Sequence, residues 1–163
     1  MIDPPDYKDS KAAGGNPCLE QTLESHEMCC LVETFPDNHK VLAEFKDTLE
    51  LALLYAKSVT LGLPEQWPKS AEVMARNRRI GTSMSGIAQF ISKRGAQRLS
   101  EWSEAGYQHL RLVDQRLSKE FKVNESIKLT SIKPSGTVSL LAGATPGIHF
   151  PHSNTYIRRI RLS

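Results

Sequence analysis

Two long stretches of the chain carry apolar residues at steps of three and four, the spacing that gives an amphipathic helix its buried face. In the first stretch these residues are Val41, Leu42, Phe45, Leu49, Ala52, Leu53, Ala56 and Val59. In the second they are Leu99, Trp102, Ala105, Gly106, Leu110, Val113, Leu117 and Phe121. Asp37 is expected to cap the first helix at its N-terminus and Gly62 to end it. The pattern therefore predicts one helix between these two residues and a second over residues 96–121.

Shorter apolar runs bounded by glycine and proline predict strands. Residues 28–35 are expected to form a short, largely buried strand that Pro36 ends, and residues 79–87 a strand that leads into a short helix through Phe90. The remaining elements are expected to be a short helix over residues 71–77, a strand over 127–133, a turn into a short helix over 134–139 and a last strand over 156–162. Strands that alternate with helices favour a mostly parallel α/β sheet or barrel.

The composition limits the class of protein. A length of 163 residues allows one compact domain, or a fragment of one. The formal charge of +3 is too small and too mixed to predict nucleic-acid binding, but it permits an anionic small-molecule ligand. No apolar run is long enough to span a membrane and no signal peptide is recognisable, so a soluble, cytoplasmic protein without a membrane partner is expected. The three cysteines are expected to be free thiols.

Two parts of the chain differ in composition. Residues 1–15 combine adjacent prolines and adjacent glycines with polar residues, so they are expected to be a leading segment with little order of its own. Residues 16–163 are expected to form the main domain.

The Asn-Pro-Cys-Leu-Glu sequence at residues 16–20 combines three reactive types of side chain. If the chain is extended here, Asn16, Cys18 and Glu20 project to one side, because side chains alternate along a strand. An amide, a thiol and a carboxylate then offer hydrogen bonding, a nucleophile or hydrogen-atom donor, and a general base, which suits chemistry on a diol. The alternative is an ordinary turn with Cys18 as a small buried residue and Glu20 as a solvated charge.

These residues resemble a known family. The Asn-Pro-Cys-x-Glu pattern, followed by Cys29 at 11 residues after Cys18, is similar to the active-site loop of ribonucleotide reductases. The wider sequence at residues 16–25 and 29–33 looks most like the adenosylcobalamin-dependent (class II) ribonucleoside-triphosphate reductases. The resemblance extends to about Arg161.

The resemblance implies a role for each residue of the motif. Cys18 would carry the thiyl radical that takes the 3′ hydrogen of the ribose, and Glu20 would be the base on the 3′ hydroxyl. Asn16 would hold the sugar hydroxyls. Cys29 would belong to the redox pair that protonates the departing 2′ hydroxyl and then supplies electrons by forming a disulfide.

Cys30 is expected to lie in the core, since adjacent residues of a strand point to opposite faces and Cys29 would face the substrate. The family places the redox partner of Cys29 on an earlier strand, which would precede Met1. The chain is therefore expected to be a fragment of the catalytic barrel.

A second candidate site follows the predicted strand over residues 127–133. Its residues are Pro134, Ser135, Gly136, Thr137, Val138 and Ser139. Backbone N–H groups, a helix dipole and hydroxyl groups could bind an anion there, and Gly136 allows close approach of the backbone. The alternative is a plain turn from strand to helix with Ser135 or Thr137 as the cap. The resemblance favours phosphate binding, because a similar turn late in the reductase barrel receives the substrate phosphates.

The resemblance also implies the fold and the reaction. The fold would be part of a ten-stranded α/β barrel with Cys18 on a finger loop inside it. The reaction would reduce a ribonucleoside triphosphate or diphosphate to its 2′-deoxy form, with adenosylcobalamin bound mainly by other parts of the enzyme. A dithiol reductant such as thioredoxin and the remaining segments of the reductase would be partners. Two alternatives stay open: a radical reductase fed by a metal-containing radical subunit, and an inactive nucleotide-phosphate-binding module.

Other residues are given structural roles. Two basic clusters are expected to be solvated: Arg76, Arg78 and Arg79, and Arg158, Arg159 and Arg161. Trp67 and Trp102 are expected to pack in the core, and His26 and His39 to be solvated in loops. The histidines and cysteines lack the spacing of a zinc site, so no metal site is expected.

Overall fold

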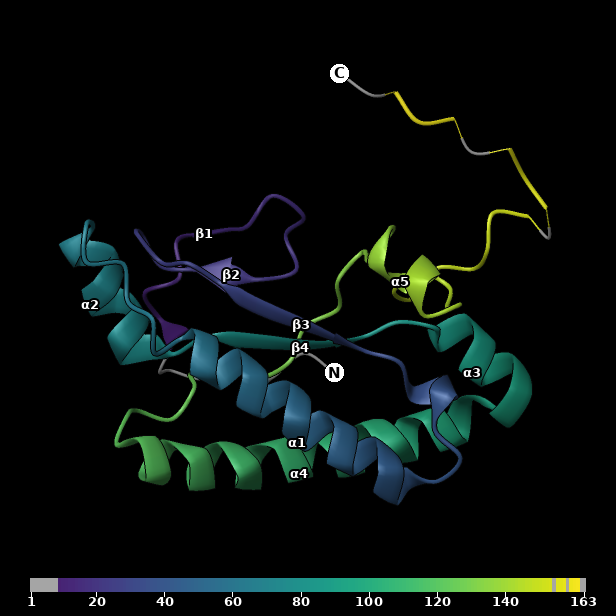
Figure 1. Ribbon diagram of the computed structural model, residues 1–163, viewed down its shortest axis with the longest axis horizontal. Helices are drawn as coiled ribbons and strands as arrows, with labels where there is room; N and C mark the ends of the chain where they lie inside the picture. The colour runs from purple at the N-terminus through teal and green to yellow at the C-terminus, as the bar shows by residue number, and fades with distance from the viewer. Residues whose placement is uncertain (1–8, 154, 158, 162–163) are drawn as a thin grey trace.

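The structure is a computed structural model that describes residues 9–153, 155–157 and 159–161. A small sheet lies at its centre, with long helices on one side and a hairpin and a short helix on the other (Figure 1). The hairpin consists of β1 (Gly14–Gly15) and β2 (Thr22–Leu23), and the sheet of β3 (Cys30–Thr34) and β4 (Ile80–Met84). The helices are η2 (Pro36–Asn38), α1 (Leu42–Val59), α2 (Pro68–Asn77), α3 (Ile87–Arg94), α4 (Ala96–Phe121) and α5 (Val138–Leu141).

The two long helices, α1 and α4, pack against each other, and α1 also packs on both strands of the sheet. Phe45 of α1 stacks on Trp102 of α4 with ring centroids 5.7 Å apart, and Phe90 meets the same indole edge-on at 5.1 Å. The buried core consists of Phe45, Leu49, Leu53, Ala56, Ile80, Phe90, Trp102, Leu110, Val113, Leu117 and Leu129. Most of these residues lie at the predicted three- and four-residue steps, so both helices are confirmed.

The start of α1 differs from the prediction. Its N-cap position is Val41, which makes no side-chain capping hydrogen bond. Asp37 lies in η2, where its carboxylate accepts a hydrogen bond from Lys93 Nζ at 2.6 Å. The expected cap is therefore wrong, because the chain forms a separate turn at residues 36–38 between the end of β3 and the start of α1.

The parallel arrangement of the strands is confirmed. β3 and β4 pair in parallel, with Cys30 opposite Ile80 and Thr34 opposite Met84. β3 is less buried than expected, since only Thr34 of its five residues is fully covered.

The predicted strand over residues 127–133 runs beside β4 but is not a regular strand. Its bridge to β4 is a parallel one between Thr130 and Thr82. The carbonyl groups of two successive residues, Lys128 and Leu129, both accept hydrogen bonds from β4, at 2.9 and 2.8 Å. In a regular β-ladder only every second residue of a strand forms hydrogen bonds to a given neighbouring strand. Because two successive residues bond to β4 here, the segment is not a regular strand.

Arg78 and Arg79 of the basic cluster before β4 are buried rather than solvated. The fully buried side chain of Arg79 donates hydrogen bonds from Nε to Glu27 at 2.9 Å and from Nη2 to Asp9 at 2.5 Å. Arg78 is also buried, and Arg76 pairs with a carboxylate of the segment after the hairpin. Carboxylate partners make burial of Arg79 possible, and these contacts hold both ends of the hairpin segment against residues 76–79, just before β4.

Three further expectations are corrected. Trp67 is 68% exposed in the connection before α2, so it is not a core residue. His39 is half-buried, and its ring nitrogens bond to the Phe35 carbonyl and the Thr48 hydroxyl. Of the residues in the range 156–162 that the structure describes, none lies in a strand, and this segment extends away from the sheet (Figure 1).

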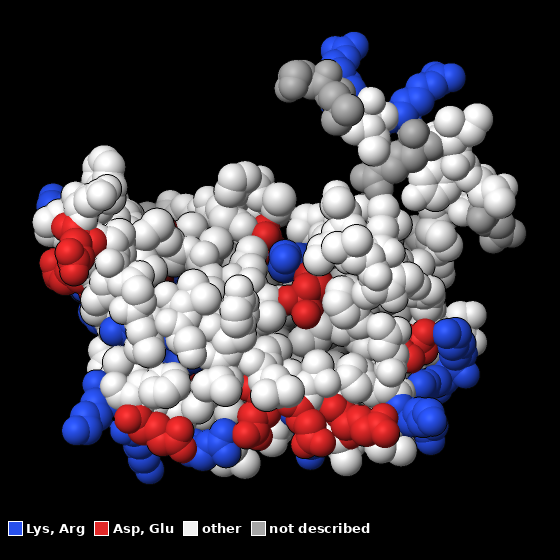
Figure 2. Space-filling model, viewed as in Figure 1, with Lys and Arg blue, Asp and Glu red and all other residues white. Residues whose placement is uncertain are grey.

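The surface is unevenly charged. Charged side chains gather along the edge formed by α4, whereas much of the face seen in Figure 2 is uncharged. Arg159 and Arg161 are exposed as expected, and Arg158 lies outside the described residues. No helix in the described part of the chain is long and apolar enough to cross a membrane.

Candidate active site

The loop that joins β1 to β2 carries Cys18 in an exposed position. Asn16 closes this loop: its backbone N–H donates to the Gln21 carbonyl and its Oδ1 accepts from the Gln21 N–H, both at 3.1 Å. Leu19 has a φ of 58°, in the left-handed region, so the chain turns back here. The expected extended conformation of residues 16–20 is therefore wrong, and the Asn16 side chain is oriented by the turn.

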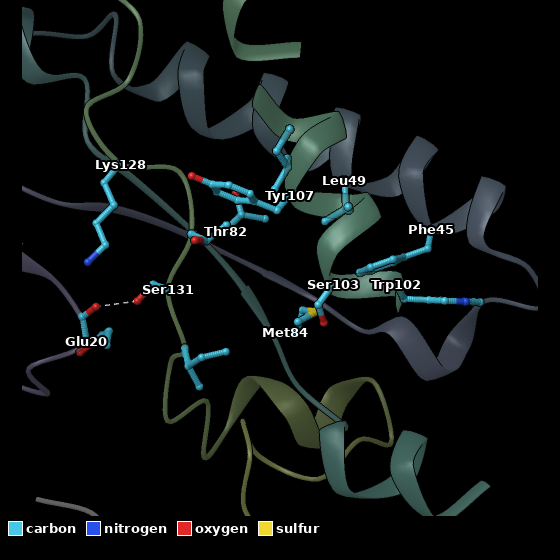
Figure 3. A pocket seen from close by; sticks show the side chains of 14 residues that line it. Glu20, Phe45, Leu49, Thr82, Met84, Trp102, Ser103, Tyr107, Lys128 and Ser131 are labelled. Carbon is cyan, nitrogen blue, oxygen red and sulfur yellow. Dashed lines mark hydrogen bonds between the residues drawn. The ribbon is translucent and has the colours of Figure 1, made fainter. Parts of the chain in front are cut away.

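Glu20 lies where this loop meets the sheet. Its carbonyl accepts a hydrogen bond from Ser131 Oγ at 2.7 Å (Figure 3). Its side chain lines a cavity of about 290 Å³ whose other end is formed by apolar and aromatic residues of α1 and α4. Its Oε2 atom is buried and has no hydrogen-bond partner among the described residues. A buried carboxylate oxygen without a hydrogen-bond partner is available to accept a proton from a ligand.

Cys29 and Cys30 have different surroundings. Cys30 Sγ donates a weak hydrogen bond to the Ala56 carbonyl at 3.4 Å and packs against the core, as expected. Cys29 is also half-buried, and burial raises the pKa of its thiol; the nearby carboxylates of Glu20 and Glu27 raise this pKa further. Burial and the nearby carboxylates of Glu20 and Glu27 thus favour the protonated form of the Cys29 thiol.

A carboxylate that the sequence analysis did not select, Glu33, lies further along β3. Its Oε1 accepts hydrogen bonds from Ser83 Oγ at 3.2 Å and Ser85 Oγ at 2.8 Å. Its Oε2 accepts a hydrogen bond from Ser135 Oγ and lies 3.6 Å from Lys133 Nζ. The sequence did contain a signal for Glu33, which is a charged residue in a largely apolar predicted strand. A carboxylate buried there needs hydrogen-bond or ion-pair partners.

The turn at residues 134–139 is held partly by its own hydroxyl groups. Ser135 has a φ of 50°, and its carbonyl accepts a hydrogen bond from Ser139 Oγ at 2.6 Å. The hydroxyls of these two serines are therefore already bonded. The backbone N–H groups of Gly136 and Thr137 have no acceptor among the described residues, and both residues are exposed. These N–H groups and the Thr137 hydroxyl are available to an anion, while Pro134 and Val138 flank them.

The two candidate motifs lie on the same side of the sheet, opposite α1 and α4 (Figure 1). β3 connects them, with Cys29 just before its first residue and Glu33 near its end. Four residues of extended chain span about 13 Å, a distance suited to a nucleotide whose sugar and phosphates bind at different points. Figure 2 shows side chains of both charges gathered between the hairpin and the α5 region. The described residues contain no group of three or more His, Cys, Asp or Glu side chains that could hold a metal ion.

Comparison with solved structures shows which fold the chain shares. No protein-family model matches the chain. A solved structure of a B12-dependent (class II) ribonucleotide reductase superposes with a TM-score of 0.80 at 36% identity, over 87% of this chain and 23% of that one. The class Id reductase alpha subunit of Actinobacillus ureae superposes with a TM-score of 0.72 at 20% identity, over 87% of this chain and 33% of that one, which shows a shared fold. The α/β fold is that of ribonucleotide reductases.

Curated relatives show which reductases the chain resembles in sequence. The chain is 60% identical over 98% of its length to the adenosylcobalamin-dependent ribonucleoside-triphosphate reductase of Euglena gracilis, of which it covers 22%. It is 61% identical over 96% of its length to a probable enzyme of the same name from Dictyostelium discoideum, covering 21%, and 38% identical over 94% to that of Lactobacillus leichmannii, covering 24%. The chain thus spans between a fifth and a quarter of the length of these relatives. The resemblance inferred from the cysteine motif is confirmed: nearly the whole chain is similar to one segment of these adenosylcobalamin-dependent reductases.

Proposed function

We propose that the chain supplies part of the catalytic domain of an adenosylcobalamin-dependent reductase that converts ribonucleoside triphosphates to 2′-deoxyribonucleotides. Residues 16–163 form part of the ten-stranded barrel in this proposal, with residues 1–15 as a leading segment and Cys18 on its finger loop. The observation that carries the proposal is that the cysteine hairpin and the turn at residues 134–139 lie on the same face of one sheet (Figure 1). A ribose and its phosphates then bind at the two ends of β3.

The exposed Cys18 thiol fits the requirement for a residue that a radical-forming cofactor can reach. Adenosylcobalamin, bound mainly by other parts of the enzyme, supplies the initiating radical. Transfer of the thiol hydrogen atom to that initiating radical would leave Cys18 as a thiyl radical. This radical takes the 3′ hydrogen atom of the ribose and returns a hydrogen atom to the same carbon after reduction.

Glu20 and Asn16 act on the sugar hydroxyls in this proposal. The unpartnered Oε2 of Glu20 takes the proton of the 3′ hydroxyl, for which its buried position and lack of a competing donor are favourable. Asn16 offers its side-chain amide N–H group to a hydroxyl, since its Oδ1 is already held by the Gln21 backbone.

Cys29 acts as the proton donor and reductant. Its raised pKa keeps the thiol protonated at neutral pH, which is the form needed to give a proton to the departing 2′ hydroxyl. The Cys29 thiolate then forms a disulfide with a second thiol, which gives up its hydrogen to the 2′ carbon, and the two electrons released reduce the sugar. Cys30 is not this second thiol because it faces α1. A dithiol such as thioredoxin reduces the disulfide.

The turn at residues 134–139 receives the phosphates. Its support is the pair of unoccupied backbone N–H groups at Gly136 and Thr137, next to the exposed Thr137 hydroxyl. The cofactor named for the relatives favours adenosylcobalamin over a metal-containing radical subunit. The presence of Cys18, Glu20 and Cys29 together favours an active enzyme over an inactive phosphate-binding module. A cytoplasmic location is part of the proposal.

The assembled reductase that contains this segment tests the proposal. With CTP as substrate, adenosylcobalamin and dithiothreitol, Cys29→Ser is expected to abolish formation of the deoxyribonucleotide. Cys30→Ser is the matched control, and it is expected to retain product formation because its thiol faces the helices. Equal product formation by the Cys29 variant and the unchanged enzyme would refute the assigned chemistry.

A further inference from the structure

We propose that Lys133 binds the substrate phosphates directly and that Glu33 positions it beside the turn at residues 134–139. This inference rests on the proposed function and adds to it a cationic residue for the same phosphate site. The turn itself offers backbone N–H groups and a hydroxyl, which are uncharged, whereas a nucleoside triphosphate carries several negative charges. A cation next to the turn supplies the missing charge.

The position of Lys133 follows from a shared oxygen atom. Oε2 of Glu33 accepts the hydrogen bond from Ser135 Oγ and also lies 3.6 Å from Lys133 Nζ. The ammonium group and the first serine of the turn are therefore neighbours. The backbone of Lys133 is fixed as well, since its N–H donates to Ser83 Oγ at 2.8 Å.

The ammonium group of Lys133 forms an ion pair with Glu33 but does not donate a hydrogen bond to it. A separation of 3.6 Å exceeds the usual range of an N–H···O hydrogen bond. The Lys133 side chain is 24% exposed, and its Nζ makes no hydrogen bond to another described residue. All three of its donors can therefore turn toward an incoming phosphate.

The Glu33 carboxylate is buried, and hydrogen bonds from serine hydroxyls stabilise its negative charge. Its side chain is only 4% exposed, and three serine hydroxyls donate to it: those of Ser83, Ser85 and Ser135. These donors stabilise the carboxylate where it is. Glu33 is thus a positioning residue, which fixes Ser135 in its left-handed conformation and keeps Lys133 at the turn.

Calorimetric titration of the assembled reductase that contains this chain with CTP, and separately with cytidine, tests this role. Lys133→Gln is expected to weaken CTP binding roughly tenfold and to leave cytidine binding unchanged, because only CTP carries phosphates. Lys133→Arg is expected to recover most of the affinity. Lys119→Gln, an exposed lysine of α4, removes the same charge far from the turn and is expected to bind CTP like the unchanged reductase.

Glu33→Gln extends the test to the positioning residue. It keeps an oxygen acceptor for the serines but loses the charge that holds Lys133, so it is expected to weaken CTP binding several-fold and to reduce the salt dependence of that binding. Thermal unfolding of each variant verifies that it is folded.

The outcomes separate this inference from the proposed function. If the unchanged reductase binds CTP and the Lys133→Gln variant binds it equally well, the role of Lys133 is refuted and the phosphate turn stands. If the unchanged reductase binds CTP no better than cytidine, the phosphate site is refuted and the role of Lys133 with it. Selective loss of CTP affinity in Lys133→Gln, with recovery in Lys133→Arg, is the result that supports it.

Discussion

The Gln21 side chain lies directly over Gly81, so close that a Cβ at residue 81 would overlap Gln21 Nε2 and a methyl group of Leu31. The same Cβ would lie 2.9 Å from Cβ of Ser131. The cysteine hairpin therefore packs against the sheet at Gly81. The absence of a side chain at residue 81 allows the hairpin to approach the sheet this closely.

Gly81→Ala is expected to push the hairpin away from the sheet. Relief of the overlap requires Gln21 and Leu31 to move, and overpacking of this kind costs about 1–3 kcal/mol. Thermal unfolding should show the loss of stability, and amide hydrogen exchange should become faster at residues 14–23. Gly14→Ala is the control, because nothing lies within 4 Å of a Cβ there. Equal behaviour of the two variants would contradict this account of Gly81.

The fully buried Arg79 provides a second prediction. Arg79→Met leaves Glu27 and Asp9 without their cationic partner, and a buried charge that loses its partner costs about 3–5 kcal/mol. Urea unfolding measures the difference in free energy. Arg111→Met, on the exposed side of α4, is expected to change stability by less than about 0.5 kcal/mol. A small effect at both positions would mean that Arg79 does not fasten the hairpin segment.

Asp9 predicts how stability depends on pH. The hydrogen bond from Arg79 lowers the pKa of the Asp9 carboxyl below its ordinary value of 3.8. In the unfolded chain this pKa returns to that value, so the stabilising contribution is complete above about pH 4 and is lost as the pH falls through the lower, folded-state pKa. Asp9→Asn should therefore cost stability at pH 7 and less at pH 2.5, measured by urea unfolding. Asp47→Asn, an exposed residue of α1, should show no such difference.

The helices could be predicted from the sequence because their signal is local. Residues such as Leu49 and Leu110 are spaced for one buried face, and that face is the one that packs. The conformation of the loop between β1 and β2 could not be predicted from such a local pattern. The turn at Leu19 depends on hydrogen bonds between Asn16 and Gln21, and alternation along an extended chain does not apply once the backbone bends.

The predictions for Arg79 and Glu33 differ from the structure because the partners of these residues are distant in the sequence. Arg79 looked solvated because nothing in its neighbourhood along the sequence indicates that Asp9 and Glu27 approach it from 70 and 52 residues away. Glu33 was missed for the same reason, since its serine partners are distant in sequence: Ser83 in β4, Ser85 just beyond β4, and Ser135 in the turn at residues 134–139. The cysteine motif could be found because its residues lie close together in the sequence.

The central claim is that Cys18 carries the radical, and release of the 3′ hydrogen tests it most directly. In the assembled reductase, a ribonucleoside triphosphate labelled with tritium at the 3′ carbon should release tritium to water during turnover. Cys18→Ser is expected to abolish this release, because a hydroxyl group does not form the hydrogen-abstracting radical that the thiol does. Cys30→Ser is expected to release tritium like the unchanged enzyme, because the Cys30 thiol contacts α1. Tritium release by the Cys18 variant at the rate of the unchanged enzyme would contradict the assignment.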